Sequence, residues 1–304
     1  MLPFARVTII GLGLIGSSVA RAVQAAMPTV RVTGYDADAS VRETADRLQF
    51  CDDVADSAGA AVIDADLVIL CVPVGIMGEV AAEFAAELPA DAVVSDVGSC
   101  KAEIVRALTE ALPNATVIPA HPVAGTERSG PEAGFATLFR HRWCIVTPPE
   151  GADPVAVERV SEFWRRLGAQ VETMAPEHHD RVLAVTSHLP HLIAYTIVGT
   201  AGDLEEVTQS EVIKYSAGGF RDFTRIAASD PTMWRDIFLN NREAVLEMLQ
   251  RFSEDLSHLQ RAIRWGDGTR CSTCSRGRGR SAGVSSSRGR MTTSRISGGR
   301  TGKG

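Results

Sequence analysis

The chain has 304 residues, of which 45% are hydrophobic and 22% are charged, as in soluble globular proteins with one large or two moderate domains. These values exclude an intrinsically disordered chain, and the longest apolar run, residues 67–77, is interrupted by Pro73 and too short to cross a bilayer. The net charge of -6 is the sum of -15 over residues 1–268 and +9 over residues 269–304. An acidic body of this kind has no electrostatic footprint for nucleic acid, so we expect neither a nucleic-acid nor a membrane partner.

Short β-branched runs alternate with helical segments rich in Ala and Leu through the first half of the chain. Strands are predicted at residues 7–10, 30–35, 67–72, 92–95, 116–119 and 143–147, and helices at 14–26, 39–48, 75–88 and 101–112. A further helix begins after Asp153, and a last strand covers residues 170–174. Apolar strands alternating with helices predict an α/β fold with a doubly wound, mostly parallel sheet, here a first domain over residues 1–175.

The strand pattern stops at Pro176. Helices are predicted at residues 177–199, 208–215 and 231–263, which gives an all-α domain over residues 176–268. This domain is too small to cover its own apolar faces, so a homodimer built through it is expected. The chain shows no cationic and apolar leader, and Cys51, Cys71, Cys100 and Cys144 stand singly, which predicts reduced thiols and a cytoplasmic protein.

The last 36 residues have a different composition from the rest of the chain. Residues 269–304 contain eight Gly, eight Ser and eight Arg, which cannot bury enough apolar surface to order themselves, so a disordered tail is predicted. Read in another frame with the codons of a GC-rich gene, the start of this tail gives an apolar, helix-compatible pattern. We therefore hypothesise a shift of reading frame near Gly268; the alternative is a genuine basic tail.

A glycine-rich segment follows the first predicted strand. Gly11-Leu12-Gly13-Leu14-Ile15-Gly16 matches GxGxxG and begins a helix, as in Rossmann-type dinucleotide sites. Gly11 permits the tight turn, Gly13 the approach of the pyrophosphate, and Gly16 close helix packing, while the helix start at Leu14 and Ile15 offers free N–H groups. Asp36, at the end of the next strand, would accept from a ribose 2′-hydroxyl and repel a 2′-phosphate, which favours NAD, unless it caps the following helix.

Three further motifs give a more specific indication. They are Asp96-Val97-Gly98-Ser99-Cys100-Lys101, His121-Pro122-Val123-Ala124-Gly125-Thr126-Glu127, and Gly218-Gly219-Phe220-Arg221-Asp222-Phe223-Thr224-Arg225-Ile226-Ala227 followed by Asp230-Pro231-Thr232-Met233-Trp234. In this order they resemble the signatures of the prephenate/arogenate dehydrogenase family, over about residues 7–265. The resemblance implies an NAD-dependent oxidative decarboxylation of prephenate or arogenate on the route to tyrosine.

Two residues of these motifs are predicted to act on the reacting hydroxyl. Ser99 and His121 follow predicted strands and should project at the carboxyl edge of the sheet. Hydride loss from a carbinol carbon needs a neutral base at the hydroxyl, which an imidazole can supply, so His121 is the predicted base. The resemblance implies that Ser99 holds the hydroxyl or the imidazole in line.

The substrate contacts are implied mainly by the same resemblance. Arg225 would bind the ring carboxylate, whose two oxygens match a guanidinium fork. The other predicted members of the substrate site are Thr126, Glu127 as a gate, Asp222, Trp234 and His191. We expect no metal, although His188, His191, His178, His179 and Asp180 stand on predicted helices where metal ligation is conceivable.

Two rival functions remain. Another β-hydroxyacid-type dehydrogenase would use a lysine of the helical domain, where Lys214 stands. An NAD-sensing or nucleic-acid-binding protein would act through the basic tail instead of through turnover.

Overall fold

The computed structural model describes residues 2–208 and 218–272, with the backbone alone at 204–208. By its internal contacts the chain divides into Met1–Leu246 and Glu247–Gly304. The first unit holds both sheets and the helices that follow them up to the start of the last long helix. Within it, β9 ends at Thr173 and α7 begins at Pro176, where the sequence predicts the change from α/β to all-α structure.

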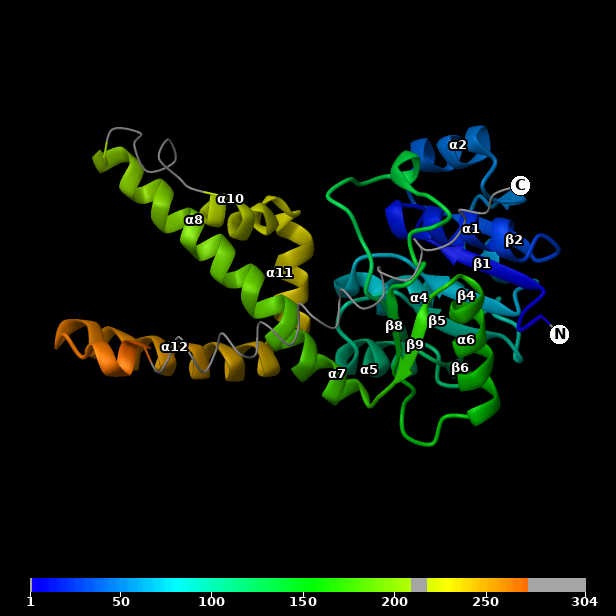
Figure 1. Ribbon diagram of the computed structural model, residues 1–304. Coiled ribbons are helices and arrows are strands. Elements are labelled where there is room, and N and C mark those ends of the chain that lie inside the picture. The colour runs from blue at the N-terminus through cyan, green and yellow to red at the C-terminus, as the bar shows by residue number, and fades with distance from the viewer. Residues whose placement is uncertain (1, 209–217, 273–304) are drawn as a thin grey trace, which may run out of the picture. The chain divides into compact units, whose positions relative to one another are not determined.

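A six-stranded parallel sheet forms the centre of the first domain (Figure 1). Its strands are β1 (Arg6–Ile10), β2 (Arg31–Tyr35), β3 (Asp53–Val54), β4 (Leu67–Leu70), β5 (Val93–Asp96) and β6 (Thr116–Val117). Their spatial order is β3-β2-β1-β4-β5-β6, and every neighbouring pair is parallel. The strand order reverses between β1 and β4, so a crevice for ligand is expected at the carboxyl ends of these strands.

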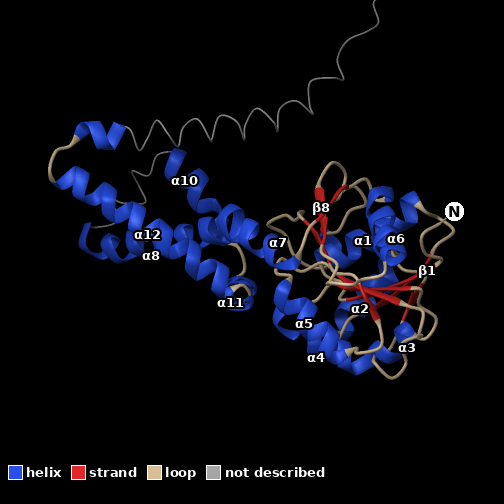
Figure 2. Ribbon diagram, turned by 90° about the horizontal axis from the view of Figure 1, so that it is seen from below, coloured by secondary structure: helices blue, strands red, loops and turns tan. Residues whose placement is uncertain are grey.

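Helices cover both faces of this sheet, which lies between them in Figure 2. They are α1 (Leu14–Ala26), α2 (Ala39–Leu48), α3 (Ala58–Val62), α4 (Met77–Phe84), α5 (Ala102–Ala111) and α6 (Pro154–Arg166). One apolar core joins α1, α2 and α6 to the sheet, and a second core joins α3, α4 and α5 to it. The central strands β1, β4 and β5 are mostly buried and mostly apolar, which is why the sequence pattern predicts them, whereas the two-residue edge strand β3 is not predicted.

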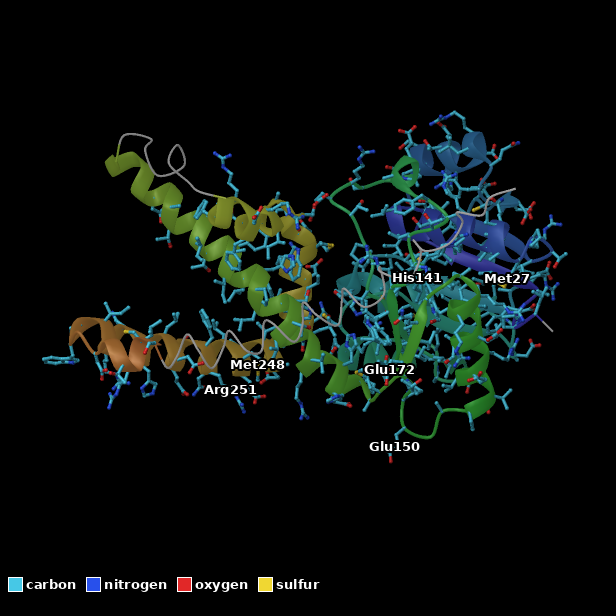
Figure 3. The ribbon with its side chains drawn as sticks, in the orientation of Figure 1. Met27, His141, Glu150, Glu172, Met248 and Arg251 are labelled. Atoms are coloured by element: carbon cyan, nitrogen blue, oxygen red, sulfur yellow. The ribbon has the colours of Figure 1, made fainter. Side chains whose placement is uncertain are left out.

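A second sheet of three strands lies beyond β6. It consists of β7 (Ala120–Pro122), β8 (Trp143–Val146) and β9 (Gln170–Thr173), with β7 antiparallel and β9 parallel to β8. The sequence predicts one strand at residues 116–119 with His121 after it; instead, His121 lies inside β7. Pro119 has no N–H for a ladder, and the chain leaves the parallel sheet before it. His141, labelled in Figure 3, lies just before β8. It adopts a φ of 60° and donates its N–H to Gly168 O at 2.9 Å.

The remaining elements are helical. They are α7 (Pro176–Leu183), a π-helical turn (Ala184–His188), α8 (Leu189–Thr208), α10 (Gly218–Thr224), a 3₁₀ turn (Arg225–Ala228), α11 (Pro231–Asn240) and α12 (Arg242–Arg264). The helix predicted at 177–199 thus runs to Thr208 and contains a π turn, while most of the one predicted at 208–215 lies outside the described residues.

The single helix predicted over residues 231–263 is wrong. Asn241 separates α11 from α12, and its side-chain amide donates to Asp180 O at 2.9 Å and contacts His188 Nδ1 at 3.0 Å. The hydrophobic pattern does not mark this position.

The start of the predicted disordered tail is also ordered where it is described. Residues 268–272 form a short helical turn, and Asp267 accepts the N–H of Arg270 at 3.0 Å as a cap. The rest of the tail, residues 273–304, lies outside the described residues, so the hypothesis of a shifted frame stays a prediction.

Candidate active site

The three glycines of the loop after β1 lie in different local surroundings. Gly11 has a φ of +95°, and a Cβ on it would lie 2.6 Å from Cys71 O. A Cβ on Gly16 would lie 1.9 Å from Gly11 O, so α1 packs directly on the loop. Around Gly13, by contrast, a Cβ would meet nothing within 4 Å. Gly11 and Gly16 are therefore required by packing, whereas Gly13 faces open space.

The helix start beside this open space carries no side-chain cap. Gly13 is the N-cap residue of α1, so the cap position offers no side chain to the first N–H groups of the helix, those around Leu14 and Ile15. Such a start attracts an anion through its N–H groups and its dipole. Open backbone at Gly13 together with an uncapped helix fits the diphosphate of a dinucleotide.

Asp36 lies one residue after β2 and points back toward the glycine-rich loop. Its Oδ2 accepts the N–H of Leu12 at 2.8 Å, and its Oδ1 accepts the N–H of Asp38 at 3.0 Å. The cap of α2 is Asp38, whose Oδ1 accepts the N–H of Ser40 at 2.8 Å. The alternative in which Asp36 caps that helix is therefore wrong, and its carboxylate is held at the edge of the loop.

His121 is joined to a second histidine and a carboxylate. His121 is 8% exposed as a residue, and its Nδ1 lies 2.8 Å from Nε2 of His179. His179 is fully buried, and its Nδ1 lies 2.8 Å from Oδ1 of Asp180. The same carboxylate accepts the backbone N–H groups of Lys101 at 2.8 Å and Ala102 at 2.9 Å. The side chains of His121, His179 and Asp180 thus form a hydrogen-bonded row, here called the file, which runs from the start of α5 to β7.

A buried ion pair fixes the strand that carries His121. Lys101 and Asp96 are both 0% exposed, and Lys101 Nζ lies 2.5 Å from Asp96 Oδ2. The ammonium also donates to Ala120 O at 2.8 Å, and Asp96 Oδ1 accepts the Ala120 N–H at 3.3 Å. Ala120 directly precedes His121, and Asp96 ends β5. His121 is thereby held at the carboxyl edge of the parallel sheet, the edge where the glycine-rich loop also lies.

Both imidazoles of this file are neutral at neutral pH. Burial lowers the pKa of His121 well below its usual range, and the charges of His179, Lys101 and His188 lower it further. Burial also lowers the pKa of His179, although the hydrogen bond with Asp180 opposes the shift. A neutral imidazole can accept a proton, as a general base must.

A second group of aromatic side chains lies between α8 and α11. The ring of His191 stacks on Trp234 with centroids 3.6 Å apart, and His188 meets the same indole edge-on at 6.0 Å. Nε2 of His188 and Nε1 of Trp234 are buried and have no hydrogen-bond partner among the described residues. Cys100 and Ile237 pack against Trp234, which connects this group to the loop that carries Ser99.

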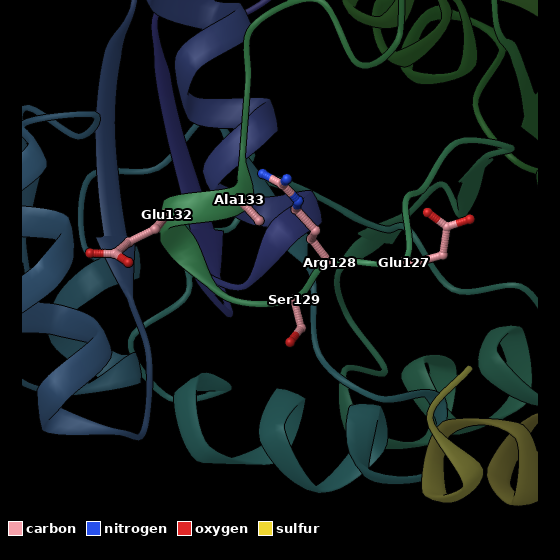
Figure 4. A pocket seen from close by; sticks show the side chains of 5 residues that line it. All are labelled: Glu127, Arg128, Ser129, Glu132 and Ala133. Atoms are coloured by element: carbon pink, nitrogen blue, oxygen red, sulfur yellow. The ribbon is translucent and has the colours of Figure 1, made fainter. Parts of the chain in front are cut away.

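The predicted carboxylate-binding residue lies on the surface. Arg225, at the start of the 3₁₀ turn, forms an ion pair with Glu127, and the side chains are 64% and 70% exposed. Glu127 lines a shallow hollow with Arg128, Ser129, Glu132 and Ala133 (Figure 4). Thr126, exposed beside it, accepts the N–H of Arg128 at 3.2 Å, and Asp222 is exposed on α10. Two residues that the sequence places 98 positions apart are thus joined.

The structure corrects one role and adds residues that sequence reasoning missed. His179, not Ser99, holds the His121 ring; Ser99 lies half-buried in the loop after β5, and no hydrogen bond joins it to His121 in the described chain. The sequence indicates His179 and Asp180 only as conceivable metal ligands, yet His179 uses both ring nitrogens in hydrogen bonds. No short motif marks a contact across 58 residues. Lys214, the rival base, lies outside the described residues.

Known proteins are similar to this chain over most of its length. A family model for the nucleotide-binding domain of prephenate dehydrogenase matches residues 19–173, and one for its dimerization domain matches residues 175–273. The chain is 46% identical to a cyclohexadienyl dehydrogenase of Zymomonas mobilis, over 88% of this chain and 92% of the relative. It is 34% identical to a prephenate dehydrogenase of Bacillus subtilis, over 84% of this chain and 70% of the relative.

A solved structure agrees with these relatives. The prephenate dehydrogenase from A. aeolicus, in complex with hydroxyphenyl propionate and NAD+, superposes with a TM-score of 0.85 at 34% identity, over 93% of this chain and 98% of that chain. The chain therefore belongs to the prephenate dehydrogenase family.

Proposed function

We propose that this chain oxidatively decarboxylates prephenate or arogenate with NAD, and that His121 is the general base. The observation that carries the proposal is the neutral, nearly buried imidazole of His121, bonded at Nδ1 and without a partner at Nε2 in the described chain. It lies at the sheet edge where the GxGxxG loop ends, and hydride chemistry requires a base at that place. The relative from A. aeolicus binds NAD+ and hydroxyphenyl propionate, which supports the assignment.

NAD, when bound, would supply the acceptor for the hydride that leaves the carbinol carbon of the ring. His121 Nε2 accepts the hydroxyl proton as the C–H bond breaks and the C=O bond forms. The bond to the ring carboxylate then breaks, carbon dioxide leaves, and its electron pair makes the ring an aromatic phenolate. His121 returns the proton to that oxygen, so no proton is gained or lost overall. The products are 4-hydroxyphenylpyruvate from prephenate and tyrosine from arogenate.

Positions in the nucleotide loop have separate roles in this proposal. Gly11 and Gly16 shape the turn, while Gly13 and the N–H groups at Leu14 and Ile15 receive the diphosphate. Asp36 accepts from the ribose and disfavours a 2′-phosphate.

The substrate is held by residues of the helical part and of the loop after β7. Arg225 binds a carboxylate of the substrate when its ion pair with Glu127 opens, so Glu127 acts as a gate beside Thr126. His191, Trp234 and Asp222 complete the pocket. Ser99 bonds the substrate hydroxyl, because Nδ1 of the His121 ring is already engaged in the hydrogen bond between His121 and His179.

We also propose a cytoplasmic homodimer that forms through the helical domain. Val185, Ile197 and Val198 are 50%, 37% and 42% exposed along α8 and the turn before it. Pro176–Asp203 is long and apolar enough to span a membrane by length and composition, yet an apolar helix covered by a second copy of the chain has the same character. The family model that matches this region is a dimerization domain. A monomer mass by light scattering at micromolar concentration would contradict the dimer.

An assay with NAD and each of the two acids tests the catalytic proposal. His121→Asn should lower kcat by roughly 10²- to 10⁴-fold with little change in the KM for NAD, the range for loss of a general base. His141→Asn is the matched control, because His141 is exposed and Asn tolerates its positive φ. An unchanged rate in His121→Asn would remove this residue from the mechanism.

A further inference from the structure

We infer that Asp180, acting through His179, fixes the tautomer of His121 so that its Nε2 carries no proton. The inference rests on the proposed role of His121 as the base. It makes His179 and Asp180 positioning residues for the reaction, since neither needs to touch the substrate.

The hydrogen bond between His179 and Asp180 has one direction, which the other contacts of the carboxylate fix. Oδ1 of Asp180 accepts the N–H of Lys101, and Oδ2 accepts the N–H of Ala102. A backbone N–H can only donate, so both oxygens act as acceptors at the start of α5. The third contact of this carboxylate, with Nδ1 of His179 at 2.8 Å, is then a donation from the ring. His179 therefore carries its proton on Nδ1.

The position of the proton on His179 in turn fixes the position of the proton on His121. A neutral His179 with a proton on Nδ1 has a lone pair on Nε2, which can only accept. The atom facing it at 2.8 Å is Nδ1 of His121, which must be the donor. A neutral His121 with its proton on Nδ1 leaves Nε2 unprotonated. The fixed donors and acceptors along the file thus leave Nε2 of His121 free to accept a proton.

The surroundings keep this file in place. His179 is fully buried, and the two imidazole rings meet edge to face at 71° with centroids 5.1 Å apart. Asn241 donates to the backbone oxygen of Asp180 at 2.9 Å, which fixes the helix position that supplies the carboxylate. Once His121 accepts the substrate proton at Nε2, the resulting cation still donates from Nδ1 to His179, so no rearrangement is needed during the step.

Variants of His179 test the inference. His179→Leu removes the acceptor for His121 Nδ1 and should lower kcat by about 10²-fold or more, with the KM for NAD unchanged. His179→Gln should recover much of that loss, because its amide oxygen can take the place of Nε2 and accept from His121. His178→Leu, the same change at the exposed neighbour on α7, is the control and should leave kcat unchanged. Equal losses in the Leu and Gln variants would overturn the inference.

Two further measurements separate this inference from the proposed function. In the double variant His121→Asn/His179→Leu, kcat should equal that of His121→Asn alone, since His179 acts only through His121. Multiplied losses would overturn the inference and leave His121 as the base, whereas an active His121→Asn would refute the proposed function. Histidine-selective ¹⁵N spectra of the unmodified protein should show His121 and His179 protonated at Nδ1 only. A proton on His121 Nε2 would overturn the inference whatever the activity or stability of the variants.

Discussion

Acidification should destabilise the protein through His188, which is fully buried on the π-helical turn. Burial is the largest cause that lowers the pKa of this imidazole to about 4; the charge of Asp180 opposes the shift, and those of His179 and His191 add to it. In the unfolded chain the same group takes up a proton near pH 6.5. Below that pH the unfolded state binds a proton that the folded state does not, so stability is lost as the pH falls from 6.5 toward 4.

The size of the effect follows from the width of this window. A gap of about 2.5 pH units corresponds to roughly 3 kcal/mol at 1.36 kcal/mol per unit, and most of it is lost by about pH 4.5. The lowered pKa values of His121, His179 and His191 act in the same direction, so the total acid loss of the protein should be larger. A variant at His188 is needed to isolate its part.

Urea unfolding at pH 7.5 and pH 4.5, at one protein concentration, measures this part. His188→Asn keeps an acceptor near Nδ1 for Asn241 but cannot take up a proton, so between the two pH values it should lose about 2–3 kcal/mol less than the unmodified protein. Any packing cost of the variant is the same at both pH values and cancels. His141→Asn, at an exposed site, should follow the unmodified protein. The reasoning is refuted if His188→Asn loses as much stability on acidification as the unmodified protein does.

Three other outcomes follow from single contacts. Lys101→Met should lower the free energy of unfolding by about 3–5 kcal/mol at neutral pH, because Asp96 is left buried without its partner; urea denaturation with a loss below about 1 kcal/mol would contradict this. Gly13→Ala should leave Tm nearly unchanged and raise the KM for NAD, whereas Gly16→Ala should lower Tm through its clash with backbone. NAD should exceed NADP in kcat/KM, and Asp36→Ser should narrow the difference; equal efficiencies in the unmodified enzyme would refute the role of Asp36.

The local features of the nucleotide domain could be predicted from the sequence because each depends on nearby residues. The central strand β4 is apolar on both faces, β1 is largely so, and the glycine-rich loop is specified within six residues, so periodicity and spacing are sufficient there. In the second sheet, β8 and β9 are predicted as strands, but β7 and its pairing are not, since β7 has three residues and its partner strand lies about twenty positions later. Local patterns carry no information about such pairing.

In the candidate site, likewise, the residues that stand in motifs could be predicted, whereas those that act through another side chain could not. His121 and Arg225 stand in motifs, and the pairing of Arg225 with Glu127 joins two of the predicted residues. The partners of His121 were not predicted, because His179 and Asp180 come from a helix whose position is set by contacts with α5 and Asn241. A side chain that works through another side chain leaves no spacing in the sequence that would identify it.

The π-helical turn at Ala184–His188 allows this region to change in length by one residue. A π turn holds one residue more than an α turn within nearly the same rotation and rise, so deleting one residue there would restore a regular helix and leave the following helix close to its present orientation. His179 and Asp180 precede the turn and His191 follows it, so the two groups should keep their mutual orientation after such a deletion. Homologous sequences should therefore accept a one-residue gap at this turn, whereas a one-residue deletion within α7 would rotate the following helix by about 100°.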